Sequence, residues 1–251
     1  MRRIALFLLV MMLSACAGQV ATEAPPDARQ LLAAANTVIR AVTTFRMTVE
    51  QSGAEYLIAV DMGIGTTEVA FRRAIAQFVA PDVMEASVRV ILMGAPADIN
   101  LFSRGDNQWF KLGTSDTWLN IQFMPGFNPA SLWQDGAGFD RALNGLQNPQ
   151  FVGAAELEDG TAVYHISGTS TSEDVAALTV GLIATGSDVN VDLYIDRHNN
   201  YPRRVVLVQP ETVSQEEPEP TTWTIDVDDF NLPAQLNDPE AASASEATPT
   251  P

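Results

Sequence analysis

The stretch Val-Asn-Val-Asp-Leu-Tyr-Ile-Asp at residues 189–196 alternates apolar and polar side chains without a break. Because successive side chains of a β-strand point to opposite faces, this pattern predicts a strand with one apolar face. The same alternation recurs at residues 45–50, 86–92, 98–101 and 222–228. Short turn-forming segments such as Arg104-Gly105-Asp106-Asn107 separate the stretches and favour hairpins. The sequence therefore predicts an antiparallel sheet whose apolar face is covered or encloses something.

Three segments have helical character. Asp27 is expected to cap an amphipathic helix in which apolar residues recur every three or four positions up to Val42. Residues 131–146 predict two short helices or a loosely packed lid. Ser172 is expected to cap a third helix that continues through residues 175–184. This third helix is apolar almost all round, which fits either a buried core element or one wall of a cavity.

Composition excludes some classes of protein. The 251 residues are 46% hydrophobic and 18% charged, so the chain has enough apolar surface to fold. The net charge is −17 and Lys111 is the only lysine. Because a nucleic-acid backbone would be repelled by this charge, we expect no nucleic-acid partner.

The first sixteen residues have the order of a bacterial lipoprotein signal. Arg2 and Arg3 precede an apolar run at residues 4–13, and Leu-Ser-Ala-Cys at residues 13–16 resembles a lipobox. Cys16 is the only cysteine of the chain, so it has no partner for an internal disulfide. We predict removal of residues 1–15 and acylation of Cys16, which would anchor the protein to a cell membrane on its extracytoplasmic side. The alternative is an ordinary secretory signal in which Cys16 is incidental.

The remaining chain divides into three predicted parts. Residues 16–26 are small, polar and proline-containing, and predict a flexible tether. Residues 27–236 carry the strands and helices and predict a single domain. Residues 237–251 contain Ala, Ser, Thr, Pro and Glu with little large apolar surface, which predicts a disordered acidic tail.

Residue patterns typical of catalysis are missing from the sequence. His165 and His198 lie in different segments without a second histidine or a cysteine at metal-ligand spacing. Gly63-Ile64-Gly65 lacks the third glycine and the following helix of a dinucleotide site. We therefore expect no enzymatic activity, no metal and no cofactor.

Several local motifs together resemble those of a known protein family. They are the helix start Asp-Ala-Arg-Gln-Leu-Leu at residues 27–32, Ala-Pro-Asp-Val at 80–83, Glu-Asp-Gly at 158–160, Tyr-Pro-Arg-Arg-Val at 201–205 and Ile-Asp-Val-Asp-Asp-Phe-Asn-Leu-Pro at 225–233. In this order, and after a lipobox, the sequence resembles the LppX/LprA/LprF/LprG lipoproteins of the bacterial envelope. The resemblance implies an α+β fold, similar to that of the lipoprotein-sorting carriers. This fold is a strongly curved antiparallel sheet, an incomplete β-barrel, with helices packed on its concave face.

The resemblance also implies a function. Proteins of this kind take up lipids or glycolipids through their acyl chains in the space between sheet and helices, and hold or move them between membrane layers. The alternative is an envelope interaction or regulatory module of the same fold with a filled core and a protein partner. We expect a monomer in either case.

Alternation assigns candidate residues to the ligand cavity. The residues expected to line the concave face are Val88, Val90, Leu92, Ile99, Leu101, Val191 and Leu193. The residues expected to cover its opening as a lid are Trp133, Phe139 and Leu143. An acyl-chain cavity requires apolar shape more than particular polar atoms, so these residues carry no chemical signature.

Replacing Cys16 tests the anchor. Cys16→Ala should release the protein from membranes into a soluble or uncleaved secretory form. The substitution removes the thiol that would carry the acyl chains, and without these chains the protein has no stable membrane anchor. Membrane fractionation measures the release, and mass spectrometry of the N-terminal peptide measures the acyl mass. A wild-type peptide without acyl mass would contradict the prediction.

Overall fold

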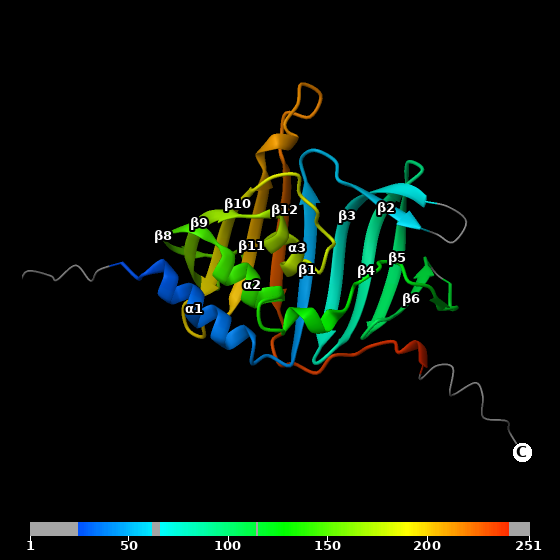
Figure 1. The fold of residues 1–251 in the computed structure, drawn as a ribbon, viewed down its shortest axis with the longest axis horizontal. Helices are drawn as coiled ribbons and strands as arrows, with labels where there is room; N and C mark the ends of the chain where they lie inside the picture. Colours follow the sequence, from blue (N-terminus) through cyan, green and yellow to red (C-terminus); the bar gives the residue numbers. More distant parts are fainter. Residues whose placement is uncertain (1–24, 62–65, 114, 241–251) are drawn as a thin grey trace, which may run out of the picture.

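The strands form one open antiparallel sheet. The computed structural model describes residues 25–61, 66–113 and 115–240, and in this part twelve strands follow the order β7-β6-β5-β4-β3-β1-β12-β11-β10-β9-β8, with β2 paired to β3 (Figure 1). Their bounds are β1 Thr44–Ser52, β2 Leu57–Asp61, β3 Thr66–Val79, β4 Val83–Leu92, β5 Ala95–Arg104, β6 Asn107–Leu112, β7 Leu119–Asn120, β8 Gln147–Glu156, β9 Ala162–Ser170, β10 Val189–Asp196, β11 Pro202–Gln209 and β12 Thr221–Asp228. The sheet curves without closing, so β7 and β8 remain as edges.

The predicted alternation decides which face is buried. In β10 the side chains of Val189, Val191, Leu193 and Ile195 are buried, whereas Asn190 between them is exposed. The same pattern holds for β1 and β12, which pair at the centre of the sheet. The predicted α+β fold with a curved antiparallel sheet is confirmed.

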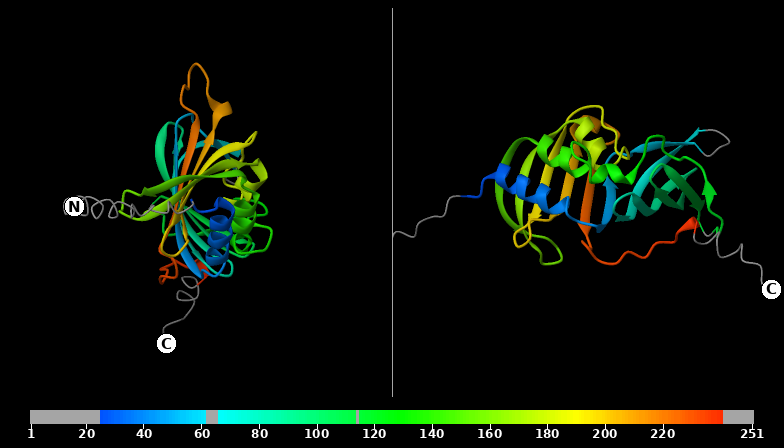
Figure 2. Two further views of the ribbon diagram at one scale, coloured as in Figure 1. Left: turned by 90° about the vertical axis from the view of Figure 1, so that its left-hand side faces the viewer. Right: turned by 60° about the horizontal axis from the view of Figure 1, so that its bottom comes forward.

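The helices lie on the concave face (Figure 2). The α-helices are α1 Ala28–Ile39, α2 Gly138–Gly145 and α3 Ser172–Leu178, and the 3-10 turns are η1 Pro129–Leu132 and η2 Pro210–Thr212. As predicted, Asp27 caps α1: its Oδ1 accepts a hydrogen bond from the N–H of Gln30 at 3.0 Å. Residues 131–146 contain part of η1 and all of α2, in agreement with two short helices.

The third helix is shorter than predicted. It is capped by Thr171 rather than Ser172, and it ends at Leu178 rather than Ala184. Val180 and Gly181 adopt positive φ values of 49° and 85°, which a right-handed helix cannot contain. The prediction was wrong at both ends because apolar periodicity does not reveal the turn that stops a helix.

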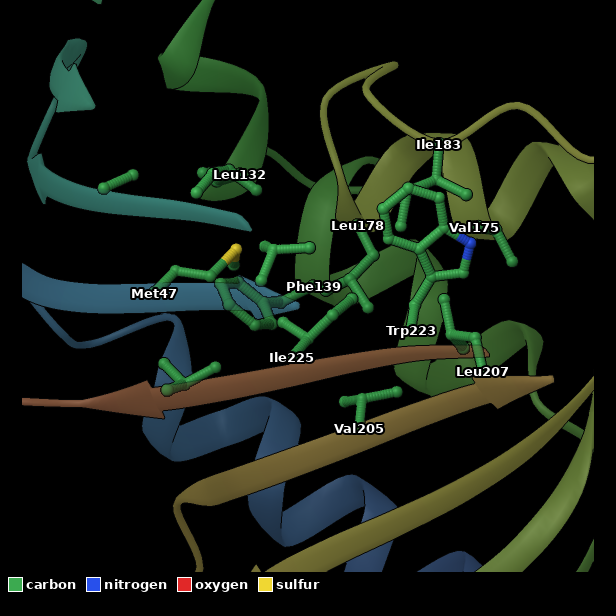
Figure 3. Close-up of a cluster of buried hydrophobic side chains, with 14 of the residues drawn as sticks. Met47, Leu132, Phe139, Val175, Leu178, Ile183, Val205, Leu207, Trp223 and Ile225 are labelled. Atoms are coloured by element: carbon green, nitrogen blue, oxygen red, sulfur yellow. The ribbon is translucent and has the colours of Figure 1, made fainter. Parts of the chain in front are cut away.

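Aromatic rings join the helices to the sheet. Phe45 of β1 stacks on Phe78 of β3, and Trp133 and Phe139 approach Phe45 from the helical layer with centroid distances of 5.5 Å. The indole Nε1 of Trp133 donates a hydrogen bond to the carbonyl of Val42 at 2.8 Å. Figure 3 shows Phe139 beside the apolar side chains of the central strands. Most of the buried apolar residues of the described chain form one cluster that extends from Leu32 to Val227 in the sequence.

Polar contacts fix the helices relative to one another. The side-chain amide of Asn36 in α1 donates to Asp140 in α2 at 2.6 Å, and the N–H of Gly136 donates to the same carboxylate at 2.7 Å. These bonds hold the pKa of Asp140 below its usual value, since they favour the ionised form. Arg141 of α2 pairs with the buried carboxylate of Asp174 in α3, with 2.8 Å between Nε and Oδ1.

The chain after β12 runs back along the bottom of the sheet towards β4 and β5 (Figure 1). The backbone N–H of Asn237 donates to Glu85 of β4 at 2.7 Å, and Arg104 of β5 pairs with Asp238 and Glu240 at 2.5 Å each. Residues 237–240 therefore have partners on two adjacent strands, which composition does not reveal. Residues 241–251 lie outside the described residues.

No helix in the described ranges is both long and apolar enough to cross a membrane.

Gly138 is the position in the helical layer where an added side chain would clash most severely. It starts α2 with φ +46°, and a Cβ there would overlap the backbone of Leu132 in η1. Gly94 has φ +80°, but a Cβ there would meet nothing within 4 Å. Gly138→Ala should lower the free energy of unfolding by more than about 3 kcal/mol, and Gly94→Ala by about 1 kcal/mol, because only the first adds overlap to backbone strain. Urea unfolding measures both, and equal losses would contradict the prediction.

Candidate functional site: an apolar cavity under one half of the sheet

The concave face has two unequally filled halves. The three α-helices lie over the half that contains β8–β12 and leave a space of only about 30 Å³ beneath them (Figure 1). Over β3–β6 a cavity of about 350 Å³ lies between the sheet, β2 and two loop segments. Ligand pockets in proteins span roughly 300–1,000 Å³, so of these two spaces only the second has the size of a binding site.

The cavity wall is apolar almost throughout. The residues that line it are Tyr56, Leu57, Ile58, Val69, Val88, Val90, Leu92, Ile99, Leu101, Phe110, Leu112, Phe123, Met124, Pro125, Gly181 and Leu182. Tyr56 contributes the only side-chain oxygen among them. A wall of this composition offers few partners to water and matches the surface of hydrocarbon.

Strand register explains how these side chains meet. Val88 of β4 lies opposite Ile99 of β5, and Ile99 lies opposite Leu112 of β6. Leu101 lies opposite Phe110 in the same way. Because paired residues of neighbouring strands share a face, the three strands present continuous apolar rows to the cavity.

The structure brings five of the seven predicted cavity residues together. Val88, Val90, Leu92, Ile99 and Leu101 all line the 350 Å³ cavity.

The other two, Val191 and Leu193, lie in the filled half and border the 30 Å³ space. The predicted lid residues Phe139 and Leu143 border that same small space, and Trp133 packs on Phe45. The structure therefore places Phe139 and Leu143 over the filled half and Trp133 against β1, and none of the three lines the larger cavity.

The cover of the cavity comes from segments that sequence reasoning did not select. Residues 123–125 and 181–182 border the cavity opposite the strands. The hydroxyl of Tyr56 accepts a hydrogen bond from the N–H of Ala184 at 2.8 Å, and this contact ties the segment after α3 to the start of β2. Apolar character alone could not have identified this cover, because its position depends on where α3 ends.

Met124, Pro125 and Gly181 also border a second, more open space of about 400 Å³ on their outer side. These three residues therefore form a partition between the cavity and the surface.

Phe110 and Leu112 are wall residues that sequence reasoning missed. They lie in β6, where Trp109 and Phe110 are adjacent apolar residues and Gln108, Trp109 and Phe110 are all buried. The strand therefore lacks the apolar-polar alternation that identified β4 and β5.

The side chain of His165 lies on the outer face of the sheet. Its Nε2 lies 2.6 Å from Asp192 of β10, and its ring stacks on Tyr194 at 4.6 Å between centroids. In the described part of the chain, no three His, Cys, Asp or Glu side chains gather in a group that could hold a metal ion. Cys16 lies outside the described residues.

Taken together, the fold and the site define a half-barrel protein with a one-sided apolar cavity. The chain belongs to the LppX_LprAFG lipoprotein family, whose sequence profile matches residues 27–236. This match confirms the resemblance drawn from the sequence motifs.

Two solved structures have the same fold. LprF from Mycobacterium bovis superposes with a TM-score of 0.62 at 13% sequence identity, over 86% of this chain and 99% of that one. The lipoprotein LppX from Mycobacterium tuberculosis superposes with a TM-score of 0.53 at 19% identity, over 84% of this chain and 100% of that one. No curated protein sequence matches this chain.

The two halves should respond differently to added volume. Leu101→Trp adds its ring next to the 350 Å³ cavity, whereas Val191→Trp adds it next to a space of 30 Å³. We expect Leu101→Trp to change the free energy of unfolding by less than about 1 kcal/mol and Val191→Trp to lower it by about 3 kcal/mol or more, because the second overpacks a filled core. Thermal and urea unfolding measure this difference, and similar losses at both positions would contradict a cavity confined to one half.

Proposed function

We propose that this protein is a membrane-anchored, extracytoplasmic lipoprotein that binds lipids or glycolipids through their acyl chains in the cavity over β3–β6. The observation that carries the proposal is the apolar wall of a 350 Å³ space in a fold whose other half is filled. Membership of a lipoprotein family supports it.

The size of the cavity suits hydrocarbon. A methylene group is similar in size to a water molecule, which takes about 30 Å³ of liquid, so the cavity has room for about a dozen methylene groups. At about 0.8 kcal/mol for each methylene removed from water, their burial contributes up to about 10 kcal/mol before the cost of immobilising the chain. A lipid held in this way would be retained during purification.

The polar headgroup would remain at the mouth of the cavity. No charged side chain belongs to the lining that the structure describes, and Tyr56 supplies its one hydroxyl. Because nothing in this lining would compensate a buried charge, the ligand is selected by its chains and not by a deeply buried headgroup.

Anchoring through Cys16 is part of the same proposal. The lipobox-like sequence at residues 13–16 and the family match support it. Loss of residues 1–15 would remove two arginines and change the net charge from −17 to −19, so the domain would stand off an anionic lipid surface rather than lie on it.

The alternative function is an interaction or regulatory module with an envelope protein partner. The close packing of α1–α3 over β8–β12 favours it, since that half alone resembles a filled core. Whether the cavity over β3–β6 holds lipid distinguishes the two functions.

Mass spectrometry of an organic extract tests the proposal. The chain from Ala17 onward, which keeps every described residue and cannot be acylated at Cys16, should carry acyl lipids close to one equivalent after purification. Leu101→Trp should reduce the co-purified lipid at least fivefold, because the ring takes up part of the cavity and obstructs the path of an acyl chain. Val152→Trp is the matched control, since Val152 is exposed on edge strand β8 and far from the cavity in the sheet order.

A wild-type protein free of extractable lipid, in which Leu101→Trp also lowers the melting temperature sharply, would favour the filled-core module and contradict lipid binding.

A further inference from the structure

The turn between β4 and β5 presents an apolar side chain that folding does not require. Met93 is 93% exposed and has φ +51°, and Gly94 beside it has φ +80°. Two-residue hairpin turns with positive φ favour Asn, Asp or Gly, so Met at this position is unfavourable for the backbone and gains no burial. The residue type therefore suits a contact outside the chain.

Met93 continues an apolar rim around the mouth of the cavity. Leu92 precedes it and lines the cavity wall. Leu57 and Leu112 also line the wall, yet 52% and 39% of their surface is exposed. We define Leu57, Leu92, Met93 and Leu112 as the rim. Leu57, Leu92 and Leu112 line the cavity, and Met93 extends this group onto the surface, so whatever covers the rim also lies over the mouth of the cavity.

The sheet edge beside the rim, at β6 and β7, carries residue types that are common where membranes meet water. The ammonium group of Lys111, the only lysine of the chain, lies 4.7 Å from the ring centroid of Trp118, and Leu119 beside it is exposed. Trp is enriched where membranes meet water, and Lys extends its charge from such a position into the aqueous phase.

Charges close to the turn cancel. Arg89 of β4 lies opposite Asp98 of β5 and donates to both carboxylate oxygens, at 2.9 and 3.1 Å. The hydrogen bond from Arg89 holds the pKa of Asp98 below its usual value, so the pair stays ionised and neutral as a unit. With a net charge of −17 on the whole chain, neutral lipid headgroups fit this surface better than anionic ones, and a second copy of the chain would be repelled.

We propose that the rim docks on the surface of a lipid bilayer with neutral or zwitterionic headgroups, with Met93 inserted among the lipids. The inference rests on the proposed function, because docking would place the cavity mouth against lipid and let a chain move between bilayer and cavity without crossing water. The start of the described chain lies at the β8 end of the molecule, and the cavity lies under β3–β6 at the other end, so an anchor before α1 leaves the rim free (Figure 1).

Vesicle flotation tests the docking. The chain from Ala17 onward is mixed with phosphatidylcholine vesicles and compared with Met93→Asn, which suits the positive φ of the turn and therefore preserves the fold. We expect Met93→Asn to reduce the partition coefficient at least fivefold, and Leu57→Asn to reduce it in the same direction. Val152→Asn, at an exposed apolar position of β8, is the matched control and should leave it unchanged. Adding phosphatidylglycerol to the vesicles should weaken binding at low salt.

A soluble fluorescent fatty acid separates docking from ligand binding. Unchanged fatty-acid uptake by Met93→Asn together with its loss of flotation supports the docking rim. Flotation that depends on Met93 in a protein without fatty-acid uptake also supports docking, but contradicts the proposed function. Equal flotation of the wild type and Met93→Asn, or no flotation of the wild type, would overturn the docking rim.

Discussion

The structure depends on one constraint: a wide curved sheet has a continuous apolar face, and the helices that follow from the same sequence are too few and too short to cover all of it. The three α-helices contain 12, 8 and 7 residues. They gather over β8–β12, where the Asp140 and Asp174 contacts hold them together. The remaining apolar rows on β4–β6 are left facing a cavity.

Trp223 marks the boundary between the two halves. It lies in β12 at the centre of the sheet and is completely buried. Phe71 of β3 and Tyr56 approach its ring at 5.2 and 4.8 Å between centroids. Through the Tyr56 hydroxyl, this aromatic group also reaches the segment after α3. A single cluster thus joins the filled half, the cavity and the cover of the cavity, and explains why a core and a binding space coexist on one sheet.

The irregular β2–β3 region shapes the cavity. Pairing between β3 and β4 shifts between Phe71 and Arg73, so β3 bends along its 14 residues. Its first part pairs with β2 and its second part with β1. Bulges of this kind increase strand twist and curvature. The bend adds Leu57 and Ile58 of β2 to the wall and brings Leu57 into the apolar rim at the mouth of the cavity.

The sequence by itself determined five of the twelve described strands, namely β1, β4, β5, β10 and β12, and the capped first helix, because period-two alternation and the Asp27 cap act over a few neighbouring residues. It also identified five wall residues, since Val88, Val90 and Leu92 share a face in any β-strand. Only the tertiary structure decided that Val191 and Leu193 lie under helices, whereas the five wall residues face a cavity. All of them alternate in the same way, and the difference arises from where α1–α3 pack. That packing depends on contacts such as Asn36 with Asp140, which join residues 104 positions apart in the chain and leave no trace in local periodicity.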